Sequence, residues 1–194
     1  QKERVDHKTD VRNWQHALDL TLVRKINSRL SIAANLPIIS NRRSSLYEHY
    51  GNNSTSPNAR NETKSFGIGD MRLSVYRWMF DPKTSKKGNV QIGLGIKLPT
   101  GDYQYQDFFQ KTDSTKVLGP VDQSIQLGDG GTGISLEINS YYVFSDVVSV
   151  YGNFYYLSNP REHNGVSTSR GGATSAANLL YGSSVMSVPD QYMI

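Results

Sequence analysis

The feature that most constrains the fold is the alternation of apolar and polar residues along several long segments. Between Val90 and Leu98 every second residue is apolar, and glutamine, glycine and lysine residues lie between them. A period of two is typical of a β-strand with one apolar face, and few windows show the i, i+3, i+4, i+7 spacing of an amphipathic helix. The sequence therefore predicts an all-β protein.

Six segments share this character, and a seventh begins near Gln191. Each of the six is about 9–12 residues long, whereas strands of soluble proteins average about 5–6 residues. About 9–11 residues are needed to cross a bilayer at a tilt. The expected strands start at Trp14, Leu30, Asp70, Val90, Gly133 and Val147.

The lengths of the connections alternate between short and long. This alternation predicts an antiparallel up-and-down meander whose long loops all lie at one end, as in a transmembrane β-barrel of the bacterial outer membrane. A soluble sandwich has no reason to place long loops at alternate connections. The short connections are 25–29, 80–89 and 144–146, and the long ones are 40–66, 99–132 and 158–191.

In such a barrel the apolar alternate residues face lipid, and the others face a polar lumen. The inward positions carry isolated charges, for which two roles are open: salt bridges that fill the lumen, or a lining that filters solutes. Arg77 falls among the apolar positions, so it either snorkels near the rim or marks a slip in the register. The candidate lumen-lining residues are Asp19, Asp70, Arg72, Lys97 and Glu137.

Aromatic residues gather near the ends of the expected strands. These are the positions of an aromatic girdle, in which amphipathic rings lie at the level of the lipid headgroups. The alternative is that aromatic residues are common in any strand. The residues concerned are Trp14, Tyr76, Trp78, Phe80, Tyr103, Tyr141, Tyr142, Phe144, Tyr155 and Tyr156.

Composition and charge exclude several classes of function. The 194 residues contain no cysteine, which removes disulfide scaffolds, thiolate metal sites and cysteine nucleophiles. The net charge of +4 is spread along the chain, so no nucleic-acid partner is expected. Asp122 and Asp129, with Asp102 nearby, are weak candidates for binding Ca²⁺; the alternative is that they are solvated turn residues.

No catalytic constellation can be assembled from the sequence. The four histidines are far apart, and His16 lies among the lipid-facing positions, which argues against a Ser-His-Asp site. The two Gly-x-Gly patterns do not lead into a helix, so no phosphate cradle is implied. We therefore expect a protein that is not an enzyme and that uses no cofactor.

Three motifs carry a family resemblance. They are Gly67–Asp70 at the start of a strand, Gly93–Asp102 (GLGIKLPTGD) at the end of another, and Leu127–Gly131 before a third. In this order, over residues 67–157, the chain resembles the meta-pathway phenol degradation family of outer-membrane proteins. The resemblance implies a transporter-like barrel of a Gram-negative bacterium, concerned with uptake of small, often aromatic, compounds. It brings no catalytic or binding residues with it.

Six strands cannot close around a packed lumen, because bacterial barrels have at least 8. The sequence therefore predicts a single domain over residues 1–194 that is an internal fragment of a barrel of about 10–14 strands. The expected place is the cell outer membrane, with the lipid bilayer, lipopolysaccharide and a small solute as partners. The leading hypothesis is porin-like passage or binding of small solutes. The alternatives are a structural or adhesive outer-membrane protein with a blocked lumen, and a soluble β-sandwich binding module.

Overall fold

The computed structural model describes residues 11–45, 48–49, 60–168 and 185–194, and this described part is all-β. One 3-10 helix, η1 (Gln123–Ile125), accompanies the strands. The strands are β1 (Arg12–Lys25), β2 (Leu30–Ser45), β3 (Asn61–Ile68), β4 (Met71–Trp78), β5 (Gly88–Leu98), β6 (Gln106–Gln110), β7 (Lys116–Pro120), β8 (Gly133–Ser145), β9 (Val148–Ser158), β10 (His163–Ser167), β11 (Val185–Ser187) and β12 (Gln191–Met193).

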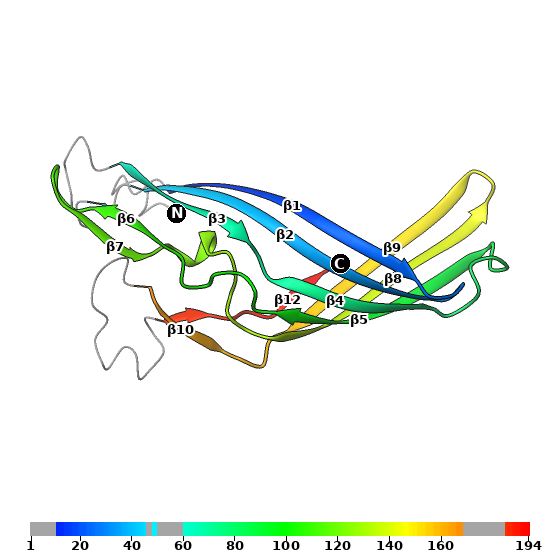
Figure 1. The fold of residues 1–194 in the computed structure, drawn as a ribbon. Coiled ribbons are helices and arrows are strands. Elements are labelled where there is room, and N and C mark those ends of the chain that lie inside the picture. Colours follow the sequence, from blue (N-terminus) through cyan, green and yellow to red (C-terminus); the bar gives the residue numbers. More distant parts are fainter. Residues whose placement is uncertain (1–10, 46–47, 50–59, 169–184) are drawn as a thin grey trace.

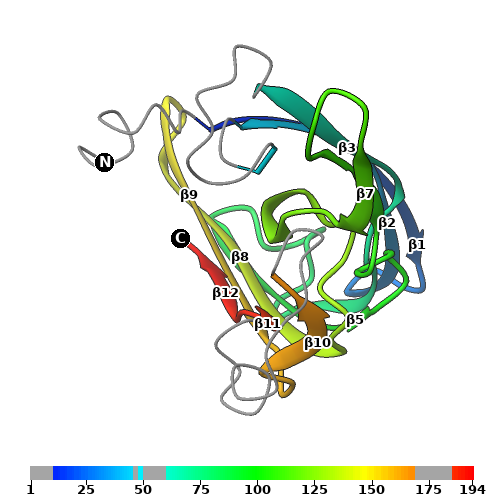
Figure 2. The same cartoon turned by 90° about the vertical axis from the view of Figure 1, so that its left-hand side faces the viewer.

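The main sheet is antiparallel and curves into a half-barrel (Figure 1 and Figure 2). Its strand order is β1-β2-β4-β5-β8-β9-β12, and β3 pairs with β2 in line with β4. Successive strands are neighbours, so the predicted up-and-down meander is confirmed for these strands. Within the described residues β1 and β12 each pair with a single strand, and they form the two edges of the sheet.

β3 and β4 are separate strands that pair with successive parts of β2. The first part of β2 pairs with β4, and the part after Pro37 pairs with β3. Between β3 and β4, the backbone N–H of Gly69 donates to the carbonyl oxygen of Pro37 at 2.8 Å. A Cβ added to Gly69 would lie 2.6 Å from Cδ1 of Ile39 and 2.8 Å from Cγ of Pro37, so a larger residue here would displace side chains of β2.

The short connections lie together at one end of the half-barrel, and the long connections lie at the other end (Figure 1). The prediction that the long connections lack strands is wrong, however. The first contains the end of β2 and β3, the second contains β6, β7 and η1, and the third contains β10 and β11. Each of these added hairpins or strands is short or polar, which explains why periodicity did not reveal it.

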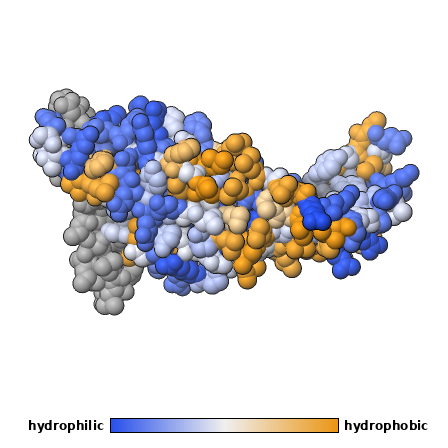
Figure 3. Space-filling view, viewed as in Figure 1, coloured by the Kyte–Doolittle hydropathy of each residue, from blue (hydrophilic) through white to orange (hydrophobic). Residues whose placement is uncertain are grey.

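The register places the expected apolar positions on one continuous face. Val75 lies opposite Ile32 on one side and Leu94 on the other, and Leu94 lies opposite Leu136. Residues that lie directly opposite in a sheet share a face. Leu94 is 60% exposed, and Figure 3 shows an apolar band across the middle of the molecule. This outer band consists of Leu18, Leu20, Leu22, Ile32, Leu73, Val75, Ile92, Leu94, Ile96 and Ile134, all of them exposed.

Arg77 keeps the register. It lies opposite Leu30 and Ile92 and is exposed, so the sheet does not slip at this position. Of the two explanations open from the sequence, the register slip is wrong. Arg77 therefore shares the outer face of β4 with apolar residues.

The buried apolar core lies away from the outer band. It gathers where the long connections fold together, and several of its members come from outside the main sheet. In the described part of the chain, no helix has the length and the apolar character required to span a membrane. The buried apolar side chains are Phe109, Val121, Ile125, Leu127, Leu157, Val166, Met186 and Val188.

Candidate functional site

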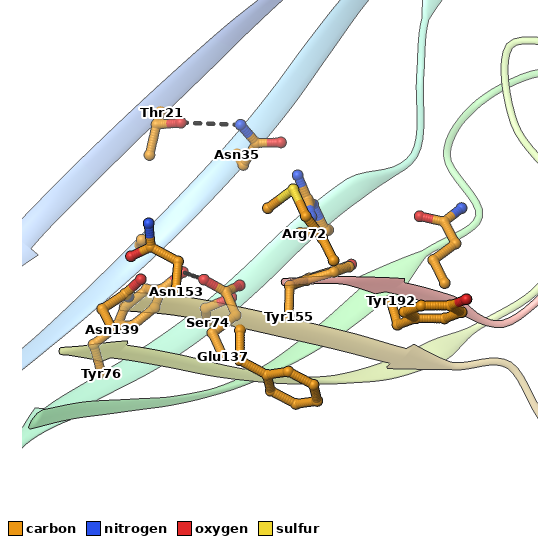
Figure 4. A pocket seen from close by; sticks show the side chains of 14 residues that line it. Thr21, Asn35, Arg72, Ser74, Tyr76, Glu137, Asn139, Asn153, Tyr155 and Tyr192 are labelled. Carbon is orange, nitrogen blue, oxygen red and sulfur yellow. Dashed lines mark hydrogen bonds between the residues drawn. The ribbon is translucent and has the colours of Figure 1, made fainter. Parts of the chain in front are cut away.

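The concave face of the sheet holds a half-open cavity of about 470 Å³ that is lined mostly by residues with polar side-chain groups (Figure 4). Its labelled side chains come from both arms of the half-barrel, with Thr21 and Asn35 on β1 and β2 and Tyr155 and Tyr192 on β9 and β12. A volume of this size is in the range of small-molecule sites. The residues that line the cavity are Thr21, Ala33, Asn35, Arg72, Ser74, Tyr76, Glu137, Asn139, Asn153, Phe154, Tyr155, Gln191, Tyr192 and Met193.

One wall of the cavity is fixed by Tyr76, whose hydroxyl donates to Oε2 of Glu137 at 2.8 Å. The two residues lie on either side of Gly93, which pairs with both. A Cβ added to Gly93 would lie 2.5 Å from the ring carbon Cε1 of Tyr76. Glycine at this position therefore leaves the space in which the tyrosine ring lies against β5.

Arg72 belongs to the same face as Asn35, which lies directly opposite it on β2. Its guanidinium carbon lies 5.5 Å from the ring centre of Tyr155, which comes from β9 on the other arm. Asn35 donates through its amide Nδ2 to Oγ1 of Thr21 at 2.9 Å. Three elements that are far apart in sequence thus bring a cation, an amide and a phenol to one place in the cavity.

Lys97 lies further toward the long connections and is buried. Its ammonium group contacts the carboxylate of Asp129 directly and lies 3.7 Å from Oδ2 of Asp70. Asp70 also accepts backbone hydrogen bonds from Gly101 at 3.0 Å and from Asp129 at 3.2 Å. This cluster ties β5 to the connection that enters β8, so its charges are largely neutralised within the protein.

In the connection 99–132 the β6–β7 hairpin extends at the end of the half-barrel where the long connections lie (Figure 1), whereas the segment around η1 lies inside the curve of the sheet (Figure 2). Asn41 on β2 donates to the carbonyl oxygen of Ile125 at 3.2 Å, and the hydroxyl of Ser65 on β3 donates to the same oxygen. On β1, Asn13 donates to the hydroxyl of Ser124 at 2.9 Å. We call this segment the inward connection, because η1 is held against the polar side of β1, β2 and β3.

A buried arginine fixes the start of η1. Arg43 places Nη2 2.7 Å from Oε1 of Glu48 and 3.2 Å from Oδ2 of Asp122. Asp122 is the N-cap of η1, and its carboxylate accepts the backbone N–H of Ser124 at 3.0 Å. One guanidinium therefore joins β2, the residue Glu48 and the inward connection.

His49 is buried, although nothing in the sequence distinguishes it from the other histidines. Its Nδ1 accepts the backbone N–H of Gln110 at 3.1 Å, and its ring centre lies 5.7 Å from that of Phe109. Burial, and to a smaller extent the charge of nearby Lys111, lower the pKa of His49 from 6.5 to about 4, and the charge of Asp107 acts in the opposite direction. Only the three-dimensional structure places His49 against the β6–β7 hairpin.

The predicted site residues divide among these places. Arg72 and Glu137 line the cavity, Asp70 and Lys97 form the cluster beside it, and Asp19 is exposed on β1 opposite Pro37. The structure therefore brings four of the five together in or beside the cavity, whereas Asp19 shares the face of Thr21 on β1 but does not line the cavity.

The two Ca²⁺ candidates hold different cations of the protein. Asp122 contacts Arg43, and Asp129 contacts Lys97. Each carboxylate therefore forms an ion pair within the protein and is more than a solvated turn residue. Among the residues that the structure describes, no group of three or more histidine, aspartate or glutamate side chains could hold a metal ion. The described geometry gives no support to a calcium site built on these two aspartates.

The aromatic residues fall into two sets. Tyr142 and Phe144 are exposed near the short connections, with ring centres 4.8 Å apart. Tyr76 and Tyr155, which were expected in a girdle, line the cavity instead. Their inward direction follows from the register with Gly93 and Glu137. The girdle prediction is therefore wrong for these two tyrosines.

Comparison with known proteins adds no family. Neither the scan of protein-family models nor the search of curated proteins gives a match.

Proposed function

We propose that this chain forms part of a transmembrane β-barrel in the outer membrane of a Gram-negative bacterium. In this proposal small solutes bind in, or pass through, its polar interior. The role is passive and needs neither catalysis nor a cofactor. The observation that carries the proposal is the exposed, in-register apolar band on one side of the sheet, opposite a polar cavity on the other side.

The outer band supports a lipid-facing surface for an energetic reason. Burial of apolar surface stabilises a protein by roughly 25 cal/mol per Å². Soluble monomers rarely expose continuous apolar patches larger than a few hundred Å². Leu18, at 59% exposed, and Leu94, at 60%, are not covered by any second layer among the described residues. A soluble β-sandwich would require a second sheet over this band.

The two edges of the sheet support closure by further strands. β1 presents a 14-residue edge whose other side is unpaired in the described part of the chain, and β12 forms the opposite edge. Long exposed edges of this kind invite pairing with other strands. We propose that additional strands join β1 to β12 and complete the barrel, as expected for an internal portion of a larger one.

The seating of η1 favours a second candidate function. The inward connection is held on the concave face by several hydrogen bonds and by Arg43, so it narrows the interior near the long connections. If it fills the lumen completely, the protein is a structural or adhesive outer-membrane protein whose long loops bind a partner.

Recordings of single channels in planar lipid bilayers test the proposed passage of solutes. The full-length protein should give discrete, voltage-independent conductance steps. A protease-protection assay on lipid vesicles that contain the same protein establishes that the protein inserts into a bilayer. Insertion without any conductance step would replace solute passage by the blocked-lumen candidate, and a protein that stays soluble without detergent would contradict both.

A further inference from the structure

Arg72 differs from the other charged groups around the cavity. Lys97 contacts two carboxylates, and Glu137 accepts a hydrogen bond from the hydroxyl of Tyr76. Within the described ranges no carboxylate lies at ion-pair distance from Arg72, and its guanidinium carbon lies 5.5 Å from the centre of the Tyr155 ring. A partly buried guanidinium carries five N–H donors and binds carboxylates in a bidentate manner.

Two further polar atoms in the same place have no hydrogen-bond partner among the described residues. They are the hydroxyl of Tyr155 and the side-chain oxygen Oδ1 of Asn35, and both atoms are buried. Nearly all buried polar atoms of folded proteins find a partner, because leaving one unpaired costs about 1–3 kcal/mol. Other buried polar atoms of the described residues also lack a partner, but Tyr155 and Asn35 place theirs in the same cavity as the guanidinium of Arg72.

The pairing of β2 with β4 and the curvature of the sheet bring Asn35, Arg72 and Tyr155 close to one another. Asn35 lies directly opposite Arg72, and the Arg72 guanidinium lies over Tyr155. All three line the same cavity (Figure 4). A ligand that satisfies them needs an anionic group for Arg72 and the Tyr155 hydroxyl, together with a donor for Asn35.

We propose that Arg72, Tyr155 and Asn35 bind a small organic carboxylate that carries a hydroxyl group. The carboxylate accepts hydrogen bonds from the Arg72 guanidinium and the Tyr155 hydroxyl, and the hydroxyl of the ligand donates to Oδ1 of Asn35. A neutral donor fits this position better than an ammonium group, because the guanidinium of Arg72, directly opposite Asn35, has no carboxylate at ion-pair distance among the described residues and repels a further cation. The proposal rests on the proposed function and names its substrate class.

Three probes of similar size separate the contributions: 3-hydroxybutyrate, butyrate and butane-1,3-diol. Binding to the full-length protein in lipid nanodiscs is measured by isothermal titration calorimetry. We expect 3-hydroxybutyrate to bind tightest. Butyrate lacks the hydroxyl group and should bind roughly fivefold more weakly, because one neutral hydrogen bond is lost. The neutral diol lacks the carboxylate and should bind at least about tenfold more weakly, because charge-assisted hydrogen bonds are lost.

Variants assign the effect to these residues. Arg72→Gln should weaken binding of 3-hydroxybutyrate by roughly tenfold or more, and Tyr155→Phe by roughly fivefold. Arg77→Gln is the matched control, because Arg77 lies on the same strand but on the outer face, and it should leave binding unchanged. Arg72→Lys keeps the charge and should lose less affinity than Arg72→Gln, which separates ligand binding from a general loss of folding.

The outcomes distinguish this proposal from the proposed function. Conductance steps together with equal affinity for the three probes, or with no binding of any of them, would overturn the carboxylate site and leave solute passage standing; ordered water would then be the partner of the three groups. Carboxylate binding that depends on Arg72 but occurs without conductance would support the site while contradicting passage.

Discussion

The guanidinium of Arg43 lies 2.7 Å from the carboxylate of Glu48, and both side chains are buried. The same guanidinium reaches Asp122 at the start of η1 and donates to Oδ1 of Asn13 on β1 at 3.1 Å. A buried ion pair contributes little net stability compared with apolar packing, but removal of one partner leaves an uncompensated buried charge. Arg43 therefore joins β1, β2 and the start of η1 through one buried cation.

Replacement of Arg43 should both destabilise the protein and loosen η1. Arg43→Met leaves Glu48 and Asp122 without their shared cation, and we expect the free energy of unfolding in lipid vesicles to fall by roughly 3–5 kcal/mol. Urea titration measures this loss. If the inward connection narrows the lumen, the same variant should also raise the single-channel conductance.

Arg42→Met is the matched control for this variant. Arg42 is the preceding residue of β2 and faces the other way, with its guanidinium 4.3 Å from the ring centre of Trp14 and 3.6 Å from Glu62 at an exposed surface. Exposed pairs contribute about 0–1 kcal/mol. Equal losses for the two variants would show that Arg43 has no special role.

The Lys97 cluster should control the ionic selectivity of the interior. Lys97→Met leaves Asp70 and Asp129 uncompensated on the concave side, so the interior becomes more negative. We expect the reversal potential in a KCl gradient to shift toward cation selectivity, and the free energy of unfolding to fall by roughly 3 kcal/mol. Lys87→Met, in an exposed turn, is the control. An unchanged reversal potential in the Lys97 variant would place the cluster outside the conduction path.

Gly93 should tolerate no side chain. In Gly93→Ala the new methyl group would lie 2.5 Å from the Tyr76 ring, so the ring must move and its hydrogen bond to Glu137 is lost. Overpacking of this kind costs about 1–3 kcal/mol. Gly152→Ala on β9 is the comparison, because there the nearest atom is the flexible hydroxyl of Ser140 at 3.1 Å. A smaller loss of thermal stability for the Gly93 variant than for the Gly152 variant would contradict the packing described.

The contact between His49 and the β6–β7 hairpin should weaken in mild acid. Burial holds the pKa of His49 near 4, below its ordinary 6.5, so the unfolded segment takes up a proton before the folded one does. The contribution of His49 to stability is complete above about pH 6.5 and is lost as the pH falls toward 4. A proton on Nδ1 also breaks the hydrogen bond from Gln110.

Hydrogen exchange at the Gln110 amide measures this effect. Its protection factor, corrected for the intrinsic rate, should fall between pH 7 and pH 4.5. His49→Asn cannot be protonated, so its protection should be independent of pH over the same interval. A pH-dependent protection factor in the asparagine variant would assign the effect to another group.

Periodicity predicted the parts of the fold in which one face of a strand is apolar. On β5 the positions of Ile92, Leu94 and Ile96 on the outer face follow directly from alternation, and the same holds for the polar side on which Lys97 lies. β3 was missed because its buried residues include Thr63 and Ser65, which are polar. A strand that buries hydroxyls against other polar groups has no apolar alternation to read.

The candidate site was predictable only in part. Arg72 and Glu137 could be named from the polar side of their strands, but Asn35 and Tyr155 could not be joined to Arg72 without the curvature that brings β2 and β9 around one cavity. The contacts of His49 with Gln110 and of Arg43 with Asp122 join residues that are separated by long stretches of the chain. Such contacts leave no mark in the spacing of residues along the chain.

Accessibility of single spin labels along β5 and its neighbours tests the central claim most directly. The 194 residues contain no cysteine, so one cysteine at a time can be placed and labelled. In lipid vesicles, labels at Val75, Leu94 and Leu136, which share one outer row, should collide with dissolved oxygen and be shielded from a water-soluble nickel complex. Labels at Asn35 and Asn139, on the concave face, should show the reverse. Outer-row labels that collide freely with the nickel complex, or that are shielded from both reagents, would contradict a lipid-facing band and with it the proposed barrel.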